Sequence, residues 1–383
     1  MRLILVPILA PILALTALAS SGSAQAADPT FPTSAGDVTV QTVATGLAHP
    51  WSLAFLPDGR MLVTERPGRM RIVTREGKLS PPLTGVPPVL ARGQGGLFDI
   101  VLDRGFANNR TIYFSYAEPF DGGGRTALAR AQLDAGETPR LTELTVIYRQ
   151  HGPASRGQHF GGRIAQGADG NLFLTNGEHF IDRDLAQTLD NNLGKIVRIT
   201  PDGAAPNDNP FVGKSGARPE IWSYGHRNPQ GLAINPADGK LWEQEHGPMG
   251  GDEVNIIVPG HNYGWPLISY GVNYDGTPVG TGKAQLAGMD EPAWHWTPSI
   301  APSGMTFYTG GLFKAWNGSL FSGALKFQLL SRLELKGDKV VKEERLLQGL
   351  RERIRDVRQG PDGALYLLTD NSAGRILRVA PAQ

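Results

Sequence analysis

An Asp-Gly turn, followed by residues that alternate between apolar and polar, recurs along the chain. Such a turn before a period-two alternation predicts a β-hairpin, because a strand places successive side chains on opposite faces. Each copy ends on a polar residue. Four copies share the pattern, namely LPDGRMLVTE (56–65), GADGNLFLTN (167–176), PADGKLWEQE (236–245) and GPDGALYLLTD (360–370).

Two further segments, 108–117 (NNRTIYFSYA) and 318–335 (GSLFSGALKFQLLSRLEL), resemble the same unit with different turns. Second strands follow several units, as in RMRIV (69–73), GKIVRI (194–199) and RILRV (375–379). Six units at spacings of about 40 to 80 residues predict a radial repeat of sheets. We therefore expect an all-β, six-bladed β-propeller, with five or seven blades as the alternatives.

The chain is expected to form one domain over residues 27–383, because no Ser/Gly or Pro-rich linker divides it. Long loops should lie over the channel mouth of the propeller. The segment 37–46 (DVTVQTVATG) is expected to pair with the last unit and close the ring, which would remove exposed strand edges. The segment 183–192 (RDLAQTLDNN) predicts a short helix, one of few helix signals in the chain.

The first 26 residues, MRLILVPILAPILALTALASSGSAQA, predict a secretory signal peptide (1–26). They combine one Arg, a long apolar core and a small-residue site, so cleavage is expected after Ala26. Pro7 and Pro11 argue against a retained membrane anchor, and no other apolar run approaches the length of a membrane span. The mature chain is therefore expected to be periplasmic or secreted, without a membrane span.

Composition narrows the possible partners. Lys and Arg total 37 against 36 Asp and Glu, with no basic run, which disfavours nucleic acid as a partner. Cys is absent, so stability must come from a large core, ring closure or bound metal rather than from disulfides. The sequence leaves a monomer or a homodimer open, with the monomer favoured.

The segment 224–266 carries the densest group of candidate functional residues. Its Gly and Pro residues predict bends that can turn backbone carbonyls toward a hard cation, and the adjacent acids Asp252 and Glu253 can supply charge to the same ion. Arg227 offers a planar set of donors suited to a carboxylate or quinone oxygen. We expect this segment to hold Ca²⁺ and one edge of an anionic cofactor.

In a propeller, residues next to strand ends converge on the central channel, and several polar residues take such positions. Each has a structural reading of its own: His159 can be structural, and an Arg in strand 353–357 can pair with Glu352 or Asp356. Asp252 and Glu253 can form a solvated turn. The candidates are Gln94, His159, Arg227, Asn228, Lys326, Arg353 and Arg355, the last two alternating and so sharing a face.

Taken together, these cations and a single His favour oxidation with a polyanionic cofactor. Histidine can accept a hydroxyl proton near neutral pH, and cations can stabilise charge that develops on an electron acceptor. No protein side chain accepts a hydride, so a cofactor is required. The chain lacks a strand-GxGxxG-helix pattern, Cys ligands and a CxxCH site, which disfavours nicotinamide, Rossmann-type flavin, iron–sulfur and covalent haem cofactors.

At these residues the chain resembles the soluble pyrroloquinoline quinone (PQQ)-dependent aldose sugar dehydrogenases of the glucose/sorbosone dehydrogenase family. The motifs run in order along nearly the whole mature chain. They are GLAHPWSLAFLPDGRMLVTERPGRM, GQGGLFDIVLD, HFGGRI, NNLGKIVRI, YGHRNPQGLA, EHGPMGGDEVNII, NYGWP, PSIAPSGMTFYTG and RIRDVRQGPDGALYLLTD.

The resemblance implies a six-bladed propeller that holds PQQ and Ca²⁺ at the channel mouth. It makes His159 the base that takes the sugar's anomeric hydroxyl proton as hydride passes to the quinone, and puts Arg227 near the quinone carbonyl, with Asn228 beside it. It implies further cofactor contacts from Gln94, Lys326, Arg353 and Arg355. It implies calcium ligation by the carbonyls of Gly247 and Pro248, and a second calcium site with Glu253 and the Tyr263 carbonyl.

The chain departs from the family pattern in one place that bears on catalysis. The family strand after HFGGRI ends in Gly-Asp, and that Asp orients the catalytic His; here LFLTNGEHF puts Glu178 in its place. The extra methylene can shift a hydrogen bond by about an ångström, and such a shift can cost roughly a hundredfold in rate. Gln166 also stands where an apolar residue is usual.

The expected function is oxidation of aldose sugars to lactones, dependent on PQQ and Ca²⁺, with an electron acceptor that the sequence does not identify. The preferred sugar is likewise not encoded in any motif. Two alternatives stay open: a Ca²⁺-dependent, lactonase-type hydrolase, which would need metal alone, and a non-catalytic extracellular binding propeller.

Overall fold

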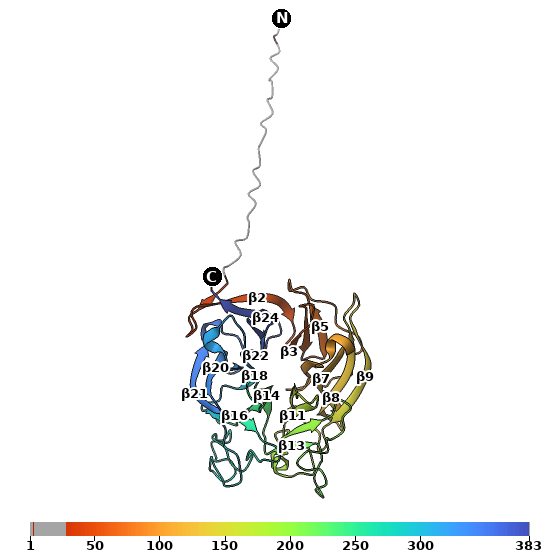
Figure 1. Ribbon diagram of the computed structural model, residues 1–383, viewed down its shortest axis with the longest axis vertical. Helices are drawn as coiled ribbons and strands as arrows, with labels where there is room; N and C mark the ends of the chain where they lie inside the picture. Colours follow the sequence, from red (N-terminus) through yellow and green to blue (C-terminus); the bar gives the residue numbers. More distant parts are fainter. Residues whose placement is uncertain (1–2, 4–27, 383) are drawn as a thin grey trace.

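In the computed structural model, six antiparallel sheets surround a central channel (Figure 1). The structure describes Leu3 and residues 28–382, so the predicted signal peptide lies outside the described residues, apart from Leu3. The six-bladed propeller prediction is confirmed. Among the described residues, no helix is long and apolar enough to cross a membrane.

Five blades follow one another along the chain, each with its first strand innermost. Their strands are β3 (Pro50–Phe55), β4 (Met61–Glu65) and β5 (Arg69–Val73); β6 (Leu97–Leu102), β7 (Thr111–Phe120), β8 (Gly123–Asp134) and β9 (Arg140–Arg149); β10 (Gly161–Gln166), β11 (Leu172–Asn176), β12 (Lys195–Ile199) and β13 (Ile221–Tyr224); β14 (Pro229–Ile234), β15 (Leu241–Glu245), β16 (Asp252–Ile257) and β17 (Trp294–Trp296); and β18 (Pro302–Phe307), β19 (Leu320–Ala324), β20 (Leu329–Lys336) and β21 (Lys339–Leu346).

The sixth blade joins the two ends of the described chain. It contains β22 (Ile354–Gln359), β23 (Leu365–Thr369), β24 (Gly374–Pro381), β2 (Val38–Leu47) and β1 (Thr30–Phe31). Strand β2 pairs antiparallel with β24, with Val40 opposite Val379. The predicted closure of the ring is therefore confirmed, and it covers the edge that β24 would otherwise expose.

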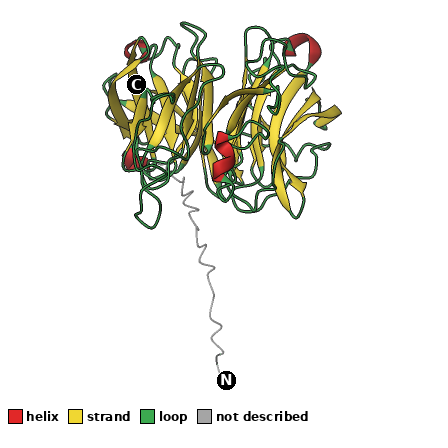
Figure 2. Ribbon diagram, turned by 90° about the horizontal axis from the view of Figure 1, so that it is seen from below, coloured by secondary structure: helices red, strands yellow, loops and turns green. Residues whose placement is uncertain are grey.

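The hydrophobic core lies between neighbouring blades. Strand β11 is buried along its whole length, as expected for a strand packed on both faces. The Asp-Gly turns close the hairpins because their glycines adopt a left-handed backbone, with φ of 83° at Gly59 and 79° at Gly363. Short helical segments are few (Figure 2): α1 (Phe106–Asn109), η1 (Arg183–Gln187), η2 (Lys314–Trp316) and η3 (Gln348–Leu350).

The helix predicted at 183–192 is wrong beyond its first turn, because only the 3₁₀ turn η1 forms. The buried ammonium of Lys195 donates to the carbonyl oxygens of Leu185 and Ala186, each at 3.0 Å. A continuing helix would need these two carbonyls as acceptors. Farther on, the Asn191 side chain accepts from the backbone N–H of Leu193 at 2.8 Å. Such local side-chain bonds compete with helix formation.

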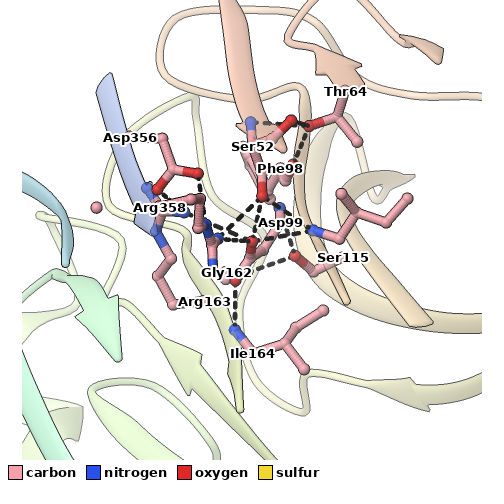
Figure 3. A network of polar contacts seen from close by, with 12 residues as sticks. Ser52, Thr64, Phe98, Asp99, Ser115, Gly162, Arg163, Ile164, Asp356 and Arg358 are labelled. Atoms are coloured by element: carbon pink, nitrogen blue, oxygen red, sulfur yellow. Dashed lines mark hydrogen bonds and ion pairs between the residues drawn. The ribbon is translucent and has the colours of Figure 1, made fainter. Parts of the chain in front are cut away.

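A buried arginine holds the innermost strands together (Figure 3). Arg163 of β10 pairs with Asp356 of β22 at 2.9 Å and lies 3.5 Å from Asp99 of β6. Arg358 adds a second cation, 2.7 Å from Asp99 and 2.8 Å from Asp356. Two cations and two carboxylates thus form a balanced, buried ion network across the channel.

Arg163 also reaches the other three innermost strands. Its Nε donates to the Gln230 carbonyl of β14 at 2.7 Å, and its guanidinium lies 4.0 Å from the centre of the Trp51 ring of β3. On β18, a Cβ added to Gly304 would lie 2.9 Å from Arg163 Nη2 and overlap Asp356 Oδ1. One guanidinium therefore contacts the innermost strands of four other blades and leaves no room for a side chain at Gly304 of the remaining one.

We expect Gly304→Ala to destabilise the propeller, because its methyl group would displace Asp356 from Arg163. Overpacking of this kind costs about 1–3 kcal/mol, and loss of a buried ion pair adds to it. Chemical denaturation would measure the change in the free energy of unfolding. Gly311→Ala is the matched control, since an added Cβ there meets nothing within 4 Å. Equal stability of the two variants would contradict the role assigned to the network.

Candidate active site

Most of the predicted site residues gather at one face of the ring because of where the strands begin and end. Gln94, His159 and Arg227 each come just before an innermost strand. Glu178 and Asp370 each follow the antiparallel second strand of a blade, which ends at the same face. Strand topology therefore brings together residues far apart in the sequence.

A cavity of about 460 Å³ opens at this face. Five of the seven predicted cofactor residues line it: Gln94, Asn228, Lys326, Arg353 and Arg355. The other lining residues are Trp51, Arg66, Gly93, Phe98, Phe160, Gly161, Gln230, His246, Ala301, Leu325 and Asp370. The two remaining predicted residues, His159 and Arg227, lie beside this cavity.

His159 is buried and tied to the cavity wall through its backbone, because its N–H donates to Gln94 Oε1 at 2.9 Å. Its Nδ1 lies 3.1 Å from Glu178 Oε2, so Glu178 makes the contact that the family assigns to Asp. An ionised Glu178 accepts from Nδ1–H, which leaves Nε2 as the proton acceptor. The longer side chain has not broken the orienting bond.

The protonation states of this pair suit a base. Burial, followed by the charge of Arg227, lowers the pKa of His159, although Glu178 opposes the shift. Burial alone would raise the pKa of Glu178, but the charge and hydrogen bond of His159 hold it below its ordinary value. A neutral imidazole beside a carboxylate results near neutral pH.

Arg227 is anchored by backbone groups and retains an unused donor. Its Nη1 donates to the carbonyls of Gly247 at 2.9 Å and His246 at 3.1 Å, and its guanidinium lies 5.1 Å from the centre of the Trp265 ring. Its backbone N–H donates to Glu245. Among the described residues, its buried Nε has no hydrogen-bond partner.

Two arginines of the cavity wall share a single carboxylate. Arg353 and Arg355 lie 2.9 and 3.4 Å from Asp370, so the alternative partners weighed from the sequence, Glu352 and Asp356, are wrong. Glu352 instead pairs with Arg375, and Asp356 belongs to the channel network. Burial lowers the pKa of Arg355 to about 10, which leaves it charged at neutral pH.

This side of the cavity therefore carries excess positive charge. Lys326 lines it and has no carboxylate partner among the described residues, and the Nε of Arg355 is buried without an acceptor. Three cations face one carboxylate here. A polyanionic ligand is the chemical class that such a wall accommodates.

The predicted metal ligands divide into two groups. Gly247, Glu253 and Tyr263 line a second cavity of about 10 Å³, roughly the space of one water or ion. Pro248 lines neither cavity, and the Gly247 carbonyl already accepts from Arg227. Gly247, Glu253 and Tyr263 thus lie at one pocket of ionic size, whereas Gly247 and Pro248 together line neither cavity.

A buried carboxylate cluster beside this small cavity was missed from the sequence. Glu243 and Glu245 of β15 share a face, and Glu245 pairs in register with Glu253 of β16. Burial, followed by the charge of Glu245, raises the pKa of both Glu243 and Glu253 well above its ordinary value. Ligand atoms of His226, Glu243 and Glu245 lie within 4.8 Å of one another.

The alternation in WEQE could have indicated this cluster, because residues two apart on a strand face the same side. The same rule corrects the expectation that Asp252 and Glu253 serve one ion. Asp252 faces away from Glu253, and its carboxylate accepts from Ser299 Oγ at 2.7 Å and from the N–H of Ala301 at 2.9 Å. Its hydrogen-bonding needs are met without a metal.

The fold and cavity define a six-bladed propeller with a cationic channel mouth and a buried His–Glu pair. The family model of glucose/sorbosone dehydrogenases matches residues 47–378. The chain is 48% identical over 347 residues to the aldose sugar dehydrogenase YliI of Escherichia coli (strain K12), covering 90% of this chain and 93% of that protein. The chain therefore belongs to the glucose/sorbosone dehydrogenase family.

Solved structures agree with this assignment. A crystal structure of a glucose dehydrogenase is 51% identical with a TM-score of 0.87, covering 90% of this chain and all of that one. The PQQ-bound form of an aldose sugar dehydrogenase from Streptomyces coelicolor is 32% identical with a TM-score of 0.74, covering 92% of this chain and 99% of that one. The family resemblance read from the motifs is confirmed.

We expect the His159 imidazole of the cofactor-free protein to titrate below the usual pKa of 6.5, since burial and Arg227 both disfavour its charged form. Glu178→Gln should lower this pKa further, because the carboxylate is the group that raises it. ¹⁵N NMR titration would measure both values, with His159→Gln identifying the resonance. An unchanged or higher pKa in Glu178→Gln would contradict the pairing.

Proposed function

We propose that this protein oxidises aldose sugars at C1 to lactones, using PQQ together with Ca²⁺. The observation that carries the proposal is the buried His159–Glu178 pair beside a cavity wall with three cations and one carboxylate. Removing two electrons and two protons from an aldose requires a base and an electron acceptor. Bound PQQ would supply the two-electron acceptor.

The residues present fit an anionic quinone. Its carboxylates would be held by Lys326, Arg353 and Arg355, and a quinone oxygen would face Arg227. The buried Nε atoms of Arg227 and Arg355, both without acceptors in the described chain, are donors that such oxygens would satisfy. Gln94 and Asn228 would complete the polar contacts from the facing blades.

The chain's own residues divide the work of catalysis. His159 Nε2 would take the proton of the anomeric hydroxyl, and Glu178 would stabilise the imidazolium that forms. Arg227, fixed by the carbonyls of His246 and Gly247, would donate to the oxygen on which negative charge develops. Burial of all three side chains excludes water and strengthens these interactions.

Calcium is proposed at the small cavity, held by Glu253 and the Tyr263 carbonyl with Glu245 beside them. Glu243 and Glu253 are buried carboxylates with raised pKa values, and such groups are the donor set that a hard divalent ion satisfies. Arg227 also lines this cavity, so the ion would share it with one cation. A second calcium at the Gly247 and Pro248 carbonyls would need Gly247 to share its bond from Arg227. We further propose export through the N-terminal signal and delivery of electrons to an external acceptor.

A Ca²⁺-dependent, lactonase-type hydrolase or a non-catalytic extracellular binding propeller would leave the excess cations of the cavity without a role. We expect the protein reconstituted with PQQ and Ca²⁺ to reduce a dye when glucose or other aldoses are added. His159→Gln should lower kcat by about 10²–10⁴-fold, the range for loss of a general base, while the quinone absorbance of bound cofactor persists. His151→Gln, at an exposed histidine, is the control. Lactone hydrolysis with metal alone, or undiminished turnover in His159→Gln, would refute the assignment.

Calcium should raise the thermal midpoint of the cofactor-free protein. A ligand at a hundred times its Kd stabilises the folded state by about 2.7 kcal/mol. Thermal unfolding with and without calcium would measure the shift, and EDTA should reverse it. Glu253→Gln should abolish the shift and Glu137→Gln, at an exposed glutamate, should retain it. A full shift of the thermal midpoint in Glu253→Gln would show that calcium binds at another site.

A further inference from the structure

Two aromatic side chains stand beside the candidate base and Arg227. Phe180 follows Glu178 in the connection from β11 to η1, and its ring centre lies 5.3 Å from that of His159 at an interplanar angle of 87°. Tyr274 comes from the long connection between β16 and β17, and its ring lies 6.5 Å from Phe180. Its hydroxyl is 3.4 Å from Arg227 Nη2.

Both rings are exposed to an extent that is unusual for this molecule. Phe180 is 38% exposed and Tyr274 is 64% exposed, and they are the only exposed Phe, Tyr or Trp side chains among residues 28–382. All other Phe, Tyr and Trp rings of the described chain are buried or half-buried. Their exposed faces therefore lie beside the candidate base and Arg227, where a substrate would have to approach.

The backbone is strained where it presents Phe180. His179 and Phe180 have φ values of 67° and 68°, a left-handed conformation that costs free energy for residues other than glycine. The N–H of Phe180 donates to Glu178 Oε2, the same oxygen that lies 3.1 Å from His159 Nδ1. One carboxylate oxygen therefore fixes both the base and the aromatic ring beside it.

We propose that Phe180 and Tyr274 form an aromatic wall that binds the apolar C–H face of a pyranose ring and presents its anomeric hydroxyl to His159. The substrate class is therefore the cyclic pyranose form of an aldose, since an open-chain polyol has no comparable flat C–H face. This inference rests on the proposed function, because it assigns specificity within the same site.

The contacts favour a sugar over a docked protein as the occupant. Phe180 contacts the base and Tyr274 contacts Arg227, so a ligand that lies against the two rings is within reach of the reacting groups. An aromatic ring contributes about 0.5–1.5 kcal/mol beyond its area burial, which corresponds to roughly a two- to tenfold change in affinity. Such binding is the same in the ground and transition states and appears in KM rather than kcat.

The experiment compares Phe180→Ala, Tyr274→Ala and Tyr274→Phe in the PQQ- and Ca²⁺-loaded protein. The two alanine variants should raise KM for glucose about two- to tenfold, with kcat and the absorbance titration of PQQ little changed. Tyr274→Phe keeps the ring and loses only the hydroxyl beside Arg227, so its KM for glucose should stay below that of Tyr274→Ala. Val341→Ala, at a valine 53% exposed on the outer strand β21, is the control.

Saturation-transfer NMR with methyl β-D-glucopyranoside measures binding without turnover, because this glycoside has no free anomeric hydroxyl. Signals that appear in the wild type and weaken in the alanine variants support the wall even if no aldose is oxidised, which separates it from the proposed function. Unchanged KM and unchanged glycoside signals in the alanine variants would overturn it. A change confined to the KM of the electron acceptor would overturn it too, and would assign the rings to acceptor docking.

Discussion

The guanidinium of Arg163 is the interaction on which the rest of the structure depends. It lies on β10 and contacts four other innermost strands, through Asp99, Asp356, the Trp51 ring and the Gln230 carbonyl. Figure 3 shows it beside Asp99, Asp356 and Arg358. Removing a charge from water is costly, and breaking a buried ion pair leaves a penalty of about 3–5 kcal/mol. Asp99 and Asp356 must therefore remain beside it, which sets how closely the blades approach.

This network divides the channel by charge. Around Arg163 and Arg358 two cations meet two carboxylates, and the site is neutral. At the mouth, the backbone carbonyl of Arg355 accepts from Arg163 while its side chain points into the cavity, where cations outnumber carboxylates. The neutral network thus supports a cationic wall in which Arg353 and Arg355 share Asp370, so positive charge remains for an anionic ligand.

The fold could be predicted because its signals are local. Asp-Gly turns and period-two alternation lie within ten residues, so they revealed the blades and also the shared face of Arg353 and Arg355. The partner of those arginines could not be predicted, since Asp370 follows the next strand, β23, and only the folded blade brings it near. The same limit hid the Glu243–Glu245 cluster, whose meaning depends on Glu253 from the paired strand.

The substitution of Glu178 for the family's Asp, which looked like a defect in the sequence, has a physical reason in the structure. The two residues after Glu178, His179 and Phe180, both have a left-handed backbone. The longer side chain of Glu178 places one oxygen where it contacts both the N–H of Phe180 and the ring of His159. Within this chain, the added methylene and the strained turn therefore compensate for each other. An Asp at this position would have to move the backbone toward His159, and that movement would also displace Phe180.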